Sequence, residues 1–351
     1  MTPRLWIYAF GMTLASATLG ASTWGNLARA DGPPFSLPLA CAVGKDCFVQ
    51  NYVDLAPGEE AKDFRCNTLT YNGHDGTDIR LRDYPQMRQG IAVLAAAAGR
   101  VRNTRDGMAD VTKETLNPSA ITGRYCGNAV ILEHDDGWTT TYCHMRQGSV
   151  AVKKDDMVTR GQKLGLIGNS GMAEFPHVHF EIQKNRVPLD PFTGKPLESG
   201  CNAADTLPNI PLETSLWTKK AAAEMPYVRT GILISGFADR VPTPPEIRNG
   251  DFAAIKFTRT SPALVFWVEL FGKVMGDTEN LLLVSPSGKA LVANSKKAIK
   301  NEASSSLYFG IKAPPGGWEQ GRYKASYILT RSVNGQAPQP VVQVEKYITI
   351  N

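Results

Sequence analysis

Several features that would indicate other classes of protein are missing from this chain of 351 residues. Its six cysteines form no C-x-x-C pair, which argues against a zinc site built from cysteines. It has no Lys/Arg cluster interleaved with aromatic residues, which argues against nucleic acid as a partner. No apolar run after residue 30 is long enough to cross a bilayer, so we expect no membrane span there.

The first thirty residues are typical of a signal peptide. Arg4 is followed by an apolar and small-residue run over residues 5–21, and Ala28-Arg29-Ala30 forms a cleavage signal before Asp31. A membrane anchor is the alternative, but the run is short and rich in Ser, Thr and Gly. We therefore expect export to the periplasm, or else outside the cell. Loss of Arg4 and Arg29 lowers the net charge from +5 to +3, with 36 basic and 33 acidic residues left.

All six cysteines follow the predicted signal peptide, and an even number in an oxidising compartment predicts disulfides. We favour a bond between Cys126 and Cys143, which flank a predicted hairpin. In regular register about the turn at Asp136-Gly137, however, Cys143 would face a residue near Val130. This bond therefore requires a bulge or a bent strand end, and the pairing of the other four cysteines stays open.

Turn residues and short alternating runs divide the chain into segments that are mainly β. We expect the signal peptide at 1–30, an irregular Cys-containing arm at 31–70, a first β domain at 71–200, a linker at 201–226 with a short helix near 218–225, and a small immunoglobulin-like β-sandwich at 227–351. The strands expected in the first domain are 77–81, 91–95, 128–133, 138–144, 163–167 and 178–182. Those expected in the second are 228–235, 253–258, 264–270, 281–284, 289–294, 323–330 and 341–350.

Four of the five histidines fall in three short motifs. His177 and His179 are two residues apart, so on a strand both imidazoles face the same side. His74 and Asp78 lie in a Gly-rich stretch that disfavours a helix and favours a turn running into a strand. A His–carboxylate pair with one further His is a common catalytic zinc set that leaves a position for water.

The remaining histidines have different expected roles. His144 ends a predicted strand and, with whichever of His177 and His179 binds no metal, would serve as proton acceptor or oxyanion donor beside a zinc-bound water. His134, beside the turn at 135–137, is interpreted as structural. Ser170 has no triad signature around it and is not expected to be a nucleophile.

Taken together, the motifs resemble the lysostaphin-type, or LytM-type, zinc metallopeptidases, which cleave peptide bonds in bacterial peptidoglycan. The resemblance covers roughly residues 71–193 and does not reach 205–351. It rests on H-x-G-x-D at 74–78, Gly-Asn-Ala-Val-Ile at 127–131, D-G-W-x-x-x-Y-x-H at 136–144, G-Q-x-L-G at 161–165, P-H-V-H-F-E at 176–181 and Asp-Pro at 190–191.

The resemblance implies that His74, Asp78 and His179 bind one Zn²⁺ and that His144 and His177 are the catalytic pair. It also implies a β-sheet peptidase domain of the duplicated hybrid motif fold, with an open groove for a stretched peptide. Two departures stand out. Phe175 replaces the usual Gly and is expected to narrow the groove, and the arm at 31–70 lies outside the common core, so that it could cover the site.

The leading hypothesis is therefore a zinc endopeptidase acting on peptidoglycan cross-links. The alternatives are a catalytically silent regulator or wall-binding protein of the same fold and, less favoured by export and Asp78, a sugar-transport phosphocarrier. The sequence leaves open which peptide bond is cut, the role and any protein partner of the C-terminal domain, and the oligomeric state.

Overall fold

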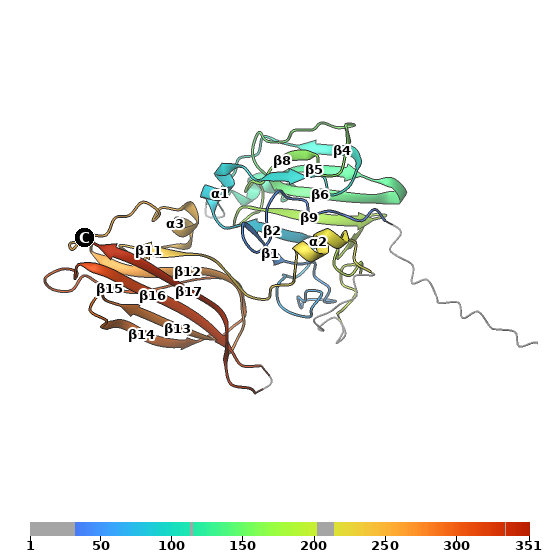
Figure 1. Ribbon diagram of the computed structural model, residues 1–351. Coiled ribbons are helices and arrows are strands. Elements are labelled where there is room, and N and C mark those ends of the chain that lie inside the picture. The colour runs from blue at the N-terminus through green and yellow to red at the C-terminus, as the bar shows by residue number, and fades with distance from the viewer. Residues whose placement is uncertain (1–31, 113–114, 202–213, 334) are drawn as a thin grey trace, which may run out of the picture.

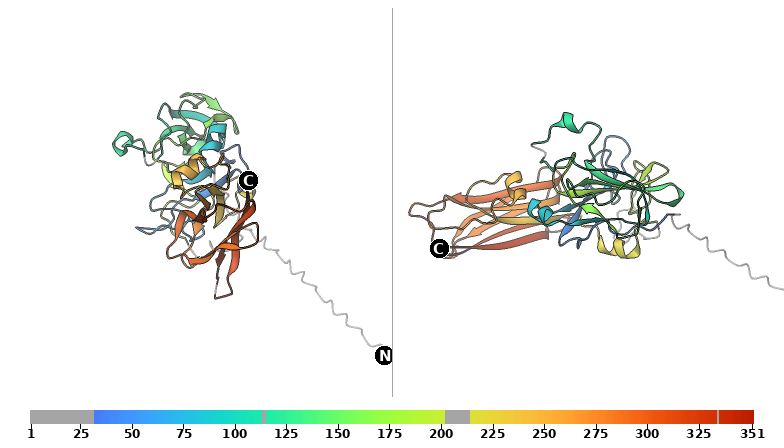
Figure 2. Two further views of the ribbon diagram at one scale, coloured as in Figure 1. Left: turned by 90° about the vertical axis from the view of Figure 1, so that its left-hand side faces the viewer. Right: turned by 90° about the horizontal axis from the view of Figure 1, so that it is seen from above.

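The computed structural model describes residues 32–112, 115–201, 214–333 and 335–351. The expected signal peptide, at residues 1–30, lies outside the described residues. The described chain is mainly β, as predicted, and forms two β-rich bodies that lie side by side (Figure 1). The molecule is elongated, with the C-terminus at the outer end of the second body (Figure 2). Among its described helices, none combines the length and the apolar character that crossing a membrane would require.

The first body is built around one large antiparallel sheet in the order β1-β2-β9-β6-β5-β4-β7, with β10 paired to β9, and a small sheet of β3 and β8. Its strands are β1 (Cys47–Asn51), β2 (Thr77–Leu81), β3 (Ala92–Leu94), β4 (Gly99–Arg105), β5 (Asn128–Glu133), β6 (Trp138–Met145), β7 (Met157–Val158), β8 (Lys163–Leu166), β9 (His177–Lys184) and β10 (Val187–Leu189). The helices are α1 (Tyr84–Gln89), the 3₁₀ turns η1 (Pro118–Ile121) and η2 (Asp135–Gly137), and α2 (Lys219–Glu224), which lies within the expected linker, where a short helix was predicted.

The second body is a sandwich of two antiparallel sheets, ordered β11-β12-β15 and β14-β13-β16-β17. Its core lies between the sheets and includes Phe266, Trp318, Tyr323 and Tyr327. The strands are β11 (Gly231–Ala238), β12 (Ala263–Lys273), β13 (Thr278–Val284), β14 (Ala290–Lys297), β15 (Glu302–Lys312), β16 (Gly321–Arg331) and β17 (Gln339–Ile350), and α3 (Pro244–Asn249) lies between β11 and β12. Helices α1 and α3 meet where the two bodies join (Figure 1).

All six strands expected in the first domain are present, with β2 and β5 at their predicted bounds. In the second domain, six of the seven expected strands are present, but 253–258 forms turns and coil. The sandwich contains β15 instead. The sequence did not predict this strand, because its first residues are rich in serine, which has low β propensity. The arm was expected to be irregular, but it contains strand β1, whose residues 47–51 pair with β2. The domain boundaries themselves stay predictions.

Three disulfides are present, and the favoured pair Cys126–Cys143 is one of them. The others join Cys41 to Cys47 and Cys66 to Cys201. The bulge that the favoured bond requires is there: Val130 faces Tyr142 and Asn128 faces Met145, so β6 has one more residue than β5 in between. This extra residue changes the register beside Cys143 and allows the bond to close.

Separate removal of each disulfide should lower the free energy of unfolding, and the loss should be larger for a bond that closes a longer segment of the chain. The bonded cysteines are 6, 17 and 135 residues apart in sequence. On the chain-entropy model, paired Cys→Ser variants should lose about 2, 3 and 5 kcal/mol of unfolding free energy, respectively. Urea unfolding followed by tryptophan fluorescence would measure these losses. Equal losses for the 6- and 135-residue pairs would contradict the expected order.

Candidate metal centre

The metal-binding candidates sit on two neighbouring strands whose register places them face to face. Strand β2 pairs with β9 so that Asp78 is directly opposite His179, and Arg80 is opposite His177. Because alternate residues of a strand share a face, these four side chains all point to one side of the sheet. His74 reaches the same point from the turn before β2.

Three donor atoms form a nearly equilateral triangle. His74 Nε2 lies 3.2 Å from Asp78 Oδ1 and 3.1 Å from His179 Nδ1, and the latter atom lies 3.1 Å from Asp78 Oδ1. Ligands held roughly 2.0–2.1 Å from a tetrahedral zinc ion lie about 3.3 Å apart. The predicted set of two imidazoles and one carboxylate therefore fits a zinc ion in both chemistry and spacing.

The arm orients two of these ligands. His74 Nδ1 donates to the Tyr52 carbonyl at 2.7 Å, which leaves Nε2 unprotonated and free for a metal. Asn51 Nδ2 donates to Asp78 Oδ2 at 2.9 Å, which leaves Oδ1 free. Contacts of this kind fix the tautomer and direction of metal ligands. Among the described residues, those lining the groove begin at Tyr71, so the arm supports the site from beside it and does not cover it.

The third ligand, His179, depends on two residues of the first motif. A Cβ atom at Gly76 would lie 2.6 Å from the His179 imidazole, so only glycine allows the ring this position. Asp75 Oδ1 lies 3.2 Å from His179 Nε2. Burial lowers the pKa of His179, but hydrogen bonds to the Asp75 and Asp78 carboxylates outweigh it and raise the pKa to about 10. The opposite holds for Asp78: burial raises its pKa, but the neighbouring imidazoles bring it well below its usual range.

The two other histidines face the triangle. His144 lies in the β6 bulge with φ of 60°, a left-handed conformation that is uncommon outside glycine and frequent at functional sites. Its Nδ1 contacts the Ser170 carbonyl at 2.8 Å, and His177 Nδ1 contacts the Phe175 carbonyl at 2.8 Å. Because a carbonyl only accepts, each Nδ1 carries the proton and each Nε2 is a free base.

Burial keeps these two imidazoles neutral. It lowers the pKa of His177, partly offset by Asp78, and it lowers the pKa of His144 well below the usual value, with the neighbouring His177 and His179 adding to the effect. The two rings are 4.5 Å apart between centroids, and His177 Nε2 lies 3.6 Å from Asp78 Oδ1. A pair of neutral bases therefore stands beside the triangle.

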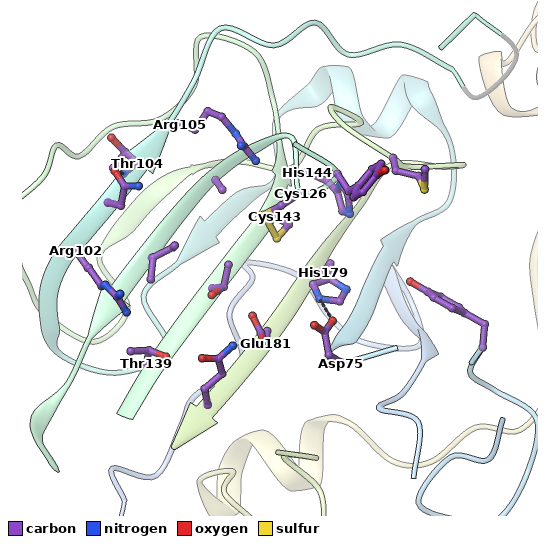
Figure 3. Close-up of a pocket in the computed structure, with 18 residues that line it drawn as sticks. Asp75, Arg102, Thr104, Arg105, Cys126, Thr139, Cys143, His144, His179 and Glu181 are labelled. Carbon is purple, nitrogen blue, oxygen red and sulfur yellow. Dashed lines mark hydrogen bonds and ion pairs between the residues drawn. A yellow bond between two sulfur atoms is a disulfide. The ribbon is translucent and has the colours of Figure 1, made fainter. Parts of the chain in front are cut away.

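The triangle opens into a groove of about 770 Å³. Its two sides carry opposite charge: Arg102 and Arg105 come from β4, whereas Asp75 and Glu181 lie near His179 (Figure 3). The other lining residues are Tyr71, Asn103, Thr104, Tyr125, Cys126, Ala129, Ile131, Thr139, Thr141, Cys143, His144, Met172 and Gln183.

The expectation that Phe175 narrows the groove is wrong. The side chain is buried and its ring lies 4.0 Å from the guanidinium of Arg80, so it points away from the groove lining. His134 is structural, as interpreted: its two ring nitrogens contact the Ala98 carbonyl and Thr140 Oγ1. Ser170 Oγ donates to the Met145 carbonyl and accepts a hydrogen bond from the Asn128 amide, so it joins two strands of the sheet to the segment before β9.

Sequence reasoning missed the residues that support the ligands. Asn51 and Tyr52 precede the first motif by more than twenty residues, and Tyr52 acts through its backbone carbonyl, which carries no sequence signal. The same is true of the Ser170 carbonyl. Asp75 lies inside the H-x-G-x-D motif and could have been singled out as the acceptor of a ligand imidazole.

Comparisons with known proteins agree with this geometry. The model of peptidase family M23 matches residues 72–191. Among relatives, the peptidoglycan DD-endopeptidase ShyB of Vibrio cholerae is 39% identical over 66 residues, covering 19% of this chain and 15% of the relative. ShyA of the same organism, also named a peptidoglycan DD-endopeptidase, is 41% identical over 58 residues, covering 16% and 13%.

The catalytic domain of lysostaphin from Staphylococcus simulans is 23% identical, covers 40% of this chain and 85% of its own, and superposes with a TM-score of 0.26. The segment 72–191 matches the model of peptidase family M23, the class that the motifs predicted. The chain spans only 13 to 15% of the length of the two Vibrio relatives.

Substitution of Asn51 by alanine should weaken zinc binding. The change removes the donor to Asp78 Oδ2 and lets the carboxylate rotate, and loss of such a partner typically lowers metal affinity about 10- to 100-fold. Competition with a chromogenic chelator would measure the affinity. Asn294→Ala, at an exposed position on β14, is the control and should match the unsubstituted protein. Equal affinities of the two variants would show that Asn51 does not support the ligand.

Zinc binding should release close to one proton at pH 7.5. The pKa of His179 in the metal-free protein is about 10, so the imidazole is protonated, and its Nδ1 must lose a proton before it can bind a metal. Apparent affinity should therefore rise with pH up to about 10. Calorimetry in buffers of different ionisation enthalpy would count the protons. Asp75→Asn removes one carboxylate from His179 and should reduce the count, whereas no release by the unsubstituted protein would contradict the assignment.

Proposed function

We propose that this protein is a zinc-dependent endopeptidase that hydrolyses peptide cross-links of bacterial peptidoglycan. The observation that carries the proposal is the triangle of His74, Asp78 and His179 donors, with the neutral imidazoles of His144 and His177 beside it and with His144 and His179 lining an open groove. His144 and His177 are the residues to which we assign proton transfer. The five residues belong to the segment matched by family M23.

Two relatives named peptidoglycan DD-endopeptidases support a direct cross-link as the substrate. The groove offers arginines on one side and carboxylates on the other, which suits a peptide that carries both carboxylate and ammonium groups. The signal-peptide pattern and three disulfides support action outside the cytoplasm, and we propose the periplasm.

The chain's own residues supply the proton transfers. A zinc ion, when bound, would polarise the scissile carbonyl and lower the pKa of a water molecule. His144 and His177 each present an unprotonated Nε2, so one of them accepts the proton of the attacking water. The imidazolium so formed then donates that proton to the leaving amine nitrogen, which balances the hydrolysis.

The test is incubation of the purified protein with isolated peptidoglycan, with and without a chelator and added Zn²⁺. Mass spectrometry of the released fragments would identify the bond. Metal-dependent release of peptides cut at the cross-link is the expected result. Bound zinc with no release would favour the silent regulator or wall-binding alternative instead.

Substitution of either catalytic candidate should abolish turnover without loss of the metal. His144→Ala and His177→Ala should each lower the rate about 10²- to 10⁴-fold, because a positioned acid–base group contributes that much. Zinc content by atomic absorption should stay at one per chain. His134→Gln, at a histidine outside the groove, is the control. Near-normal rates in both alanine variants would exclude these residues from proton transfer.

A further inference from the structure

A buried ion pair joins the two bodies next to the metal centre. Arg80, on β2, and Glu269, on β12 of the sandwich, are both 0% exposed, and Arg80 Nη2 lies 3.7 Å from Glu269 Oε1. Arg248, at the end of α3, places its Nε 2.7 Å from the same carboxylate oxygen. Burial lowers the pKa of the Arg80 guanidinium to about 10, while the Glu269 charge opposes the shift.

On the peptidase side, Arg80 is next to a catalytic candidate. It is the cross-strand partner of His177, and its guanidinium lies 4.0 Å from the Phe175 ring. The Phe175 carbonyl accepts the hydrogen bond from His177 Nδ1, and the two rings are 5.0 Å apart. Whatever holds Arg80 against Phe175 therefore also fixes the direction of the His177 imidazole.

The second cation contacts the same segment. Arg248 Nη1 donates to the Glu174 carbonyl at 3.3 Å, so both arginines that share Glu269 touch residues 174–175. Removal of the carboxylate would leave two like charges facing each other, one of them fully buried, and an unpaired buried charge is strongly unfavourable. The arginines would separate, and residues 174–175 would lose a contact on each side.

We propose that Glu269 is a positioning residue for His177, so that the C-terminal sandwich is part of the catalytic apparatus and not only an attachment. Glu269 holds Arg80 against Phe175 and Arg248 against Glu174, and through them sets the segment that carries His177. The candidate metal ligands Asp78 and His74 depend less on Glu269, because Asn51 and the Tyr52 carbonyl hold them through separate hydrogen bonds. This inference rests on the proposed function for its kinetic consequence, but its structural consequence can be measured without activity.

The test compares Glu269→Gln with Glu279→Gln in the full chain. Glu279 is also buried, but its contacts with Lys273 and Tyr327 lie within the sandwich. Glu269→Gln should lower kcat at least 10-fold with KM within about twofold, because misplacement of a catalytic group costs rate while the groove stays intact. Zinc affinity should not change. Glu279→Gln should keep the unsubstituted kcat.

Hydrogen exchange measured by mass spectrometry supplies the readout that needs no substrate. Amides of residues 172–178 should exchange faster in Glu269→Gln than in Glu279→Gln, while residues 128–133 of β5 serve as the internal reference. If the unsubstituted protein cleaves no peptidoglycan, the proposed function fails, and the exchange result still decides the positioning role. Equal exchange and equal kcat in the two variants would overturn the inference.

A milder pair of variants covers the case in which Glu269→Gln does not fold. Arg248→Ala removes the contact to the Glu174 carbonyl and one bond to Glu269, and its side chain is partly exposed. Arg240→Ala removes an arginine whose ion pairs, with Asp239 and Glu246, stay within the sandwich. Faster exchange at 172–178 and lower kcat in Arg248→Ala alone support the inference, whereas identical behaviour of the two variants contradicts it.

Discussion

The site depends above all on the antiparallel register between β2 and β9. That register places Asp78 opposite His179 and Arg80 opposite His177, so a slip of either strand by one residue would turn its two side chains to the face opposite that of their partners. Both strands are interior in the sheet, with β1 and β6 on their outer sides, which holds the register from two directions. Regular backbone pairing, rather than a flexible loop, thus fixes the distance between the carboxylate and imidazole donors.

Backbone carbonyls then decide which nitrogen of each imidazole is available. Tyr52, Ser170 and Phe175 each accept a hydrogen bond from an Nδ1, of His74, His144 and His177 respectively. The Tyr52 carbonyl comes from a segment far from the other two in the chain, whereas Ser170 and Phe175 belong to the segment just before β9. His179 differs, since its Nε2 meets a carboxylate and its Nδ1 joins the triangle. One type of interaction therefore separates the histidine ring nitrogens that face the triangle from those that orient the rings.

The parts of this arrangement that the sequence predicts are those encoded by local spacing. His177 and His179 alternate with apolar residues, which predicts a strand. The Gly-rich stretch before Asp78 predicts a turn that leads into a strand. The candidate ligand set therefore follows from short motifs. Asn51 and the Tyr52 carbonyl could not be found in this way, because their contact with the ligands arises from strand order. Strand β15 was missed since serines have low β propensity, and only packing against β12 makes them a strand.

Phe175 shows how one side chain can take a different role from the one that its position in a motif implies. A ring at this point would narrow the groove if it faced the substrate, but it lies against the Arg80 guanidinium instead. A buried cation that has lost its hydration is stabilised by an aromatic face or by hydrogen bonds, and it also requires a countercharge. Gln50 Oε1 accepts a hydrogen bond from Arg80 Nη1 on one side, and Glu269 provides the countercharge from the sandwich. Burial of Arg80 beside His177 is thus tolerable only while the second body is in place, which gives a physical reason for the two bodies to act as one unit.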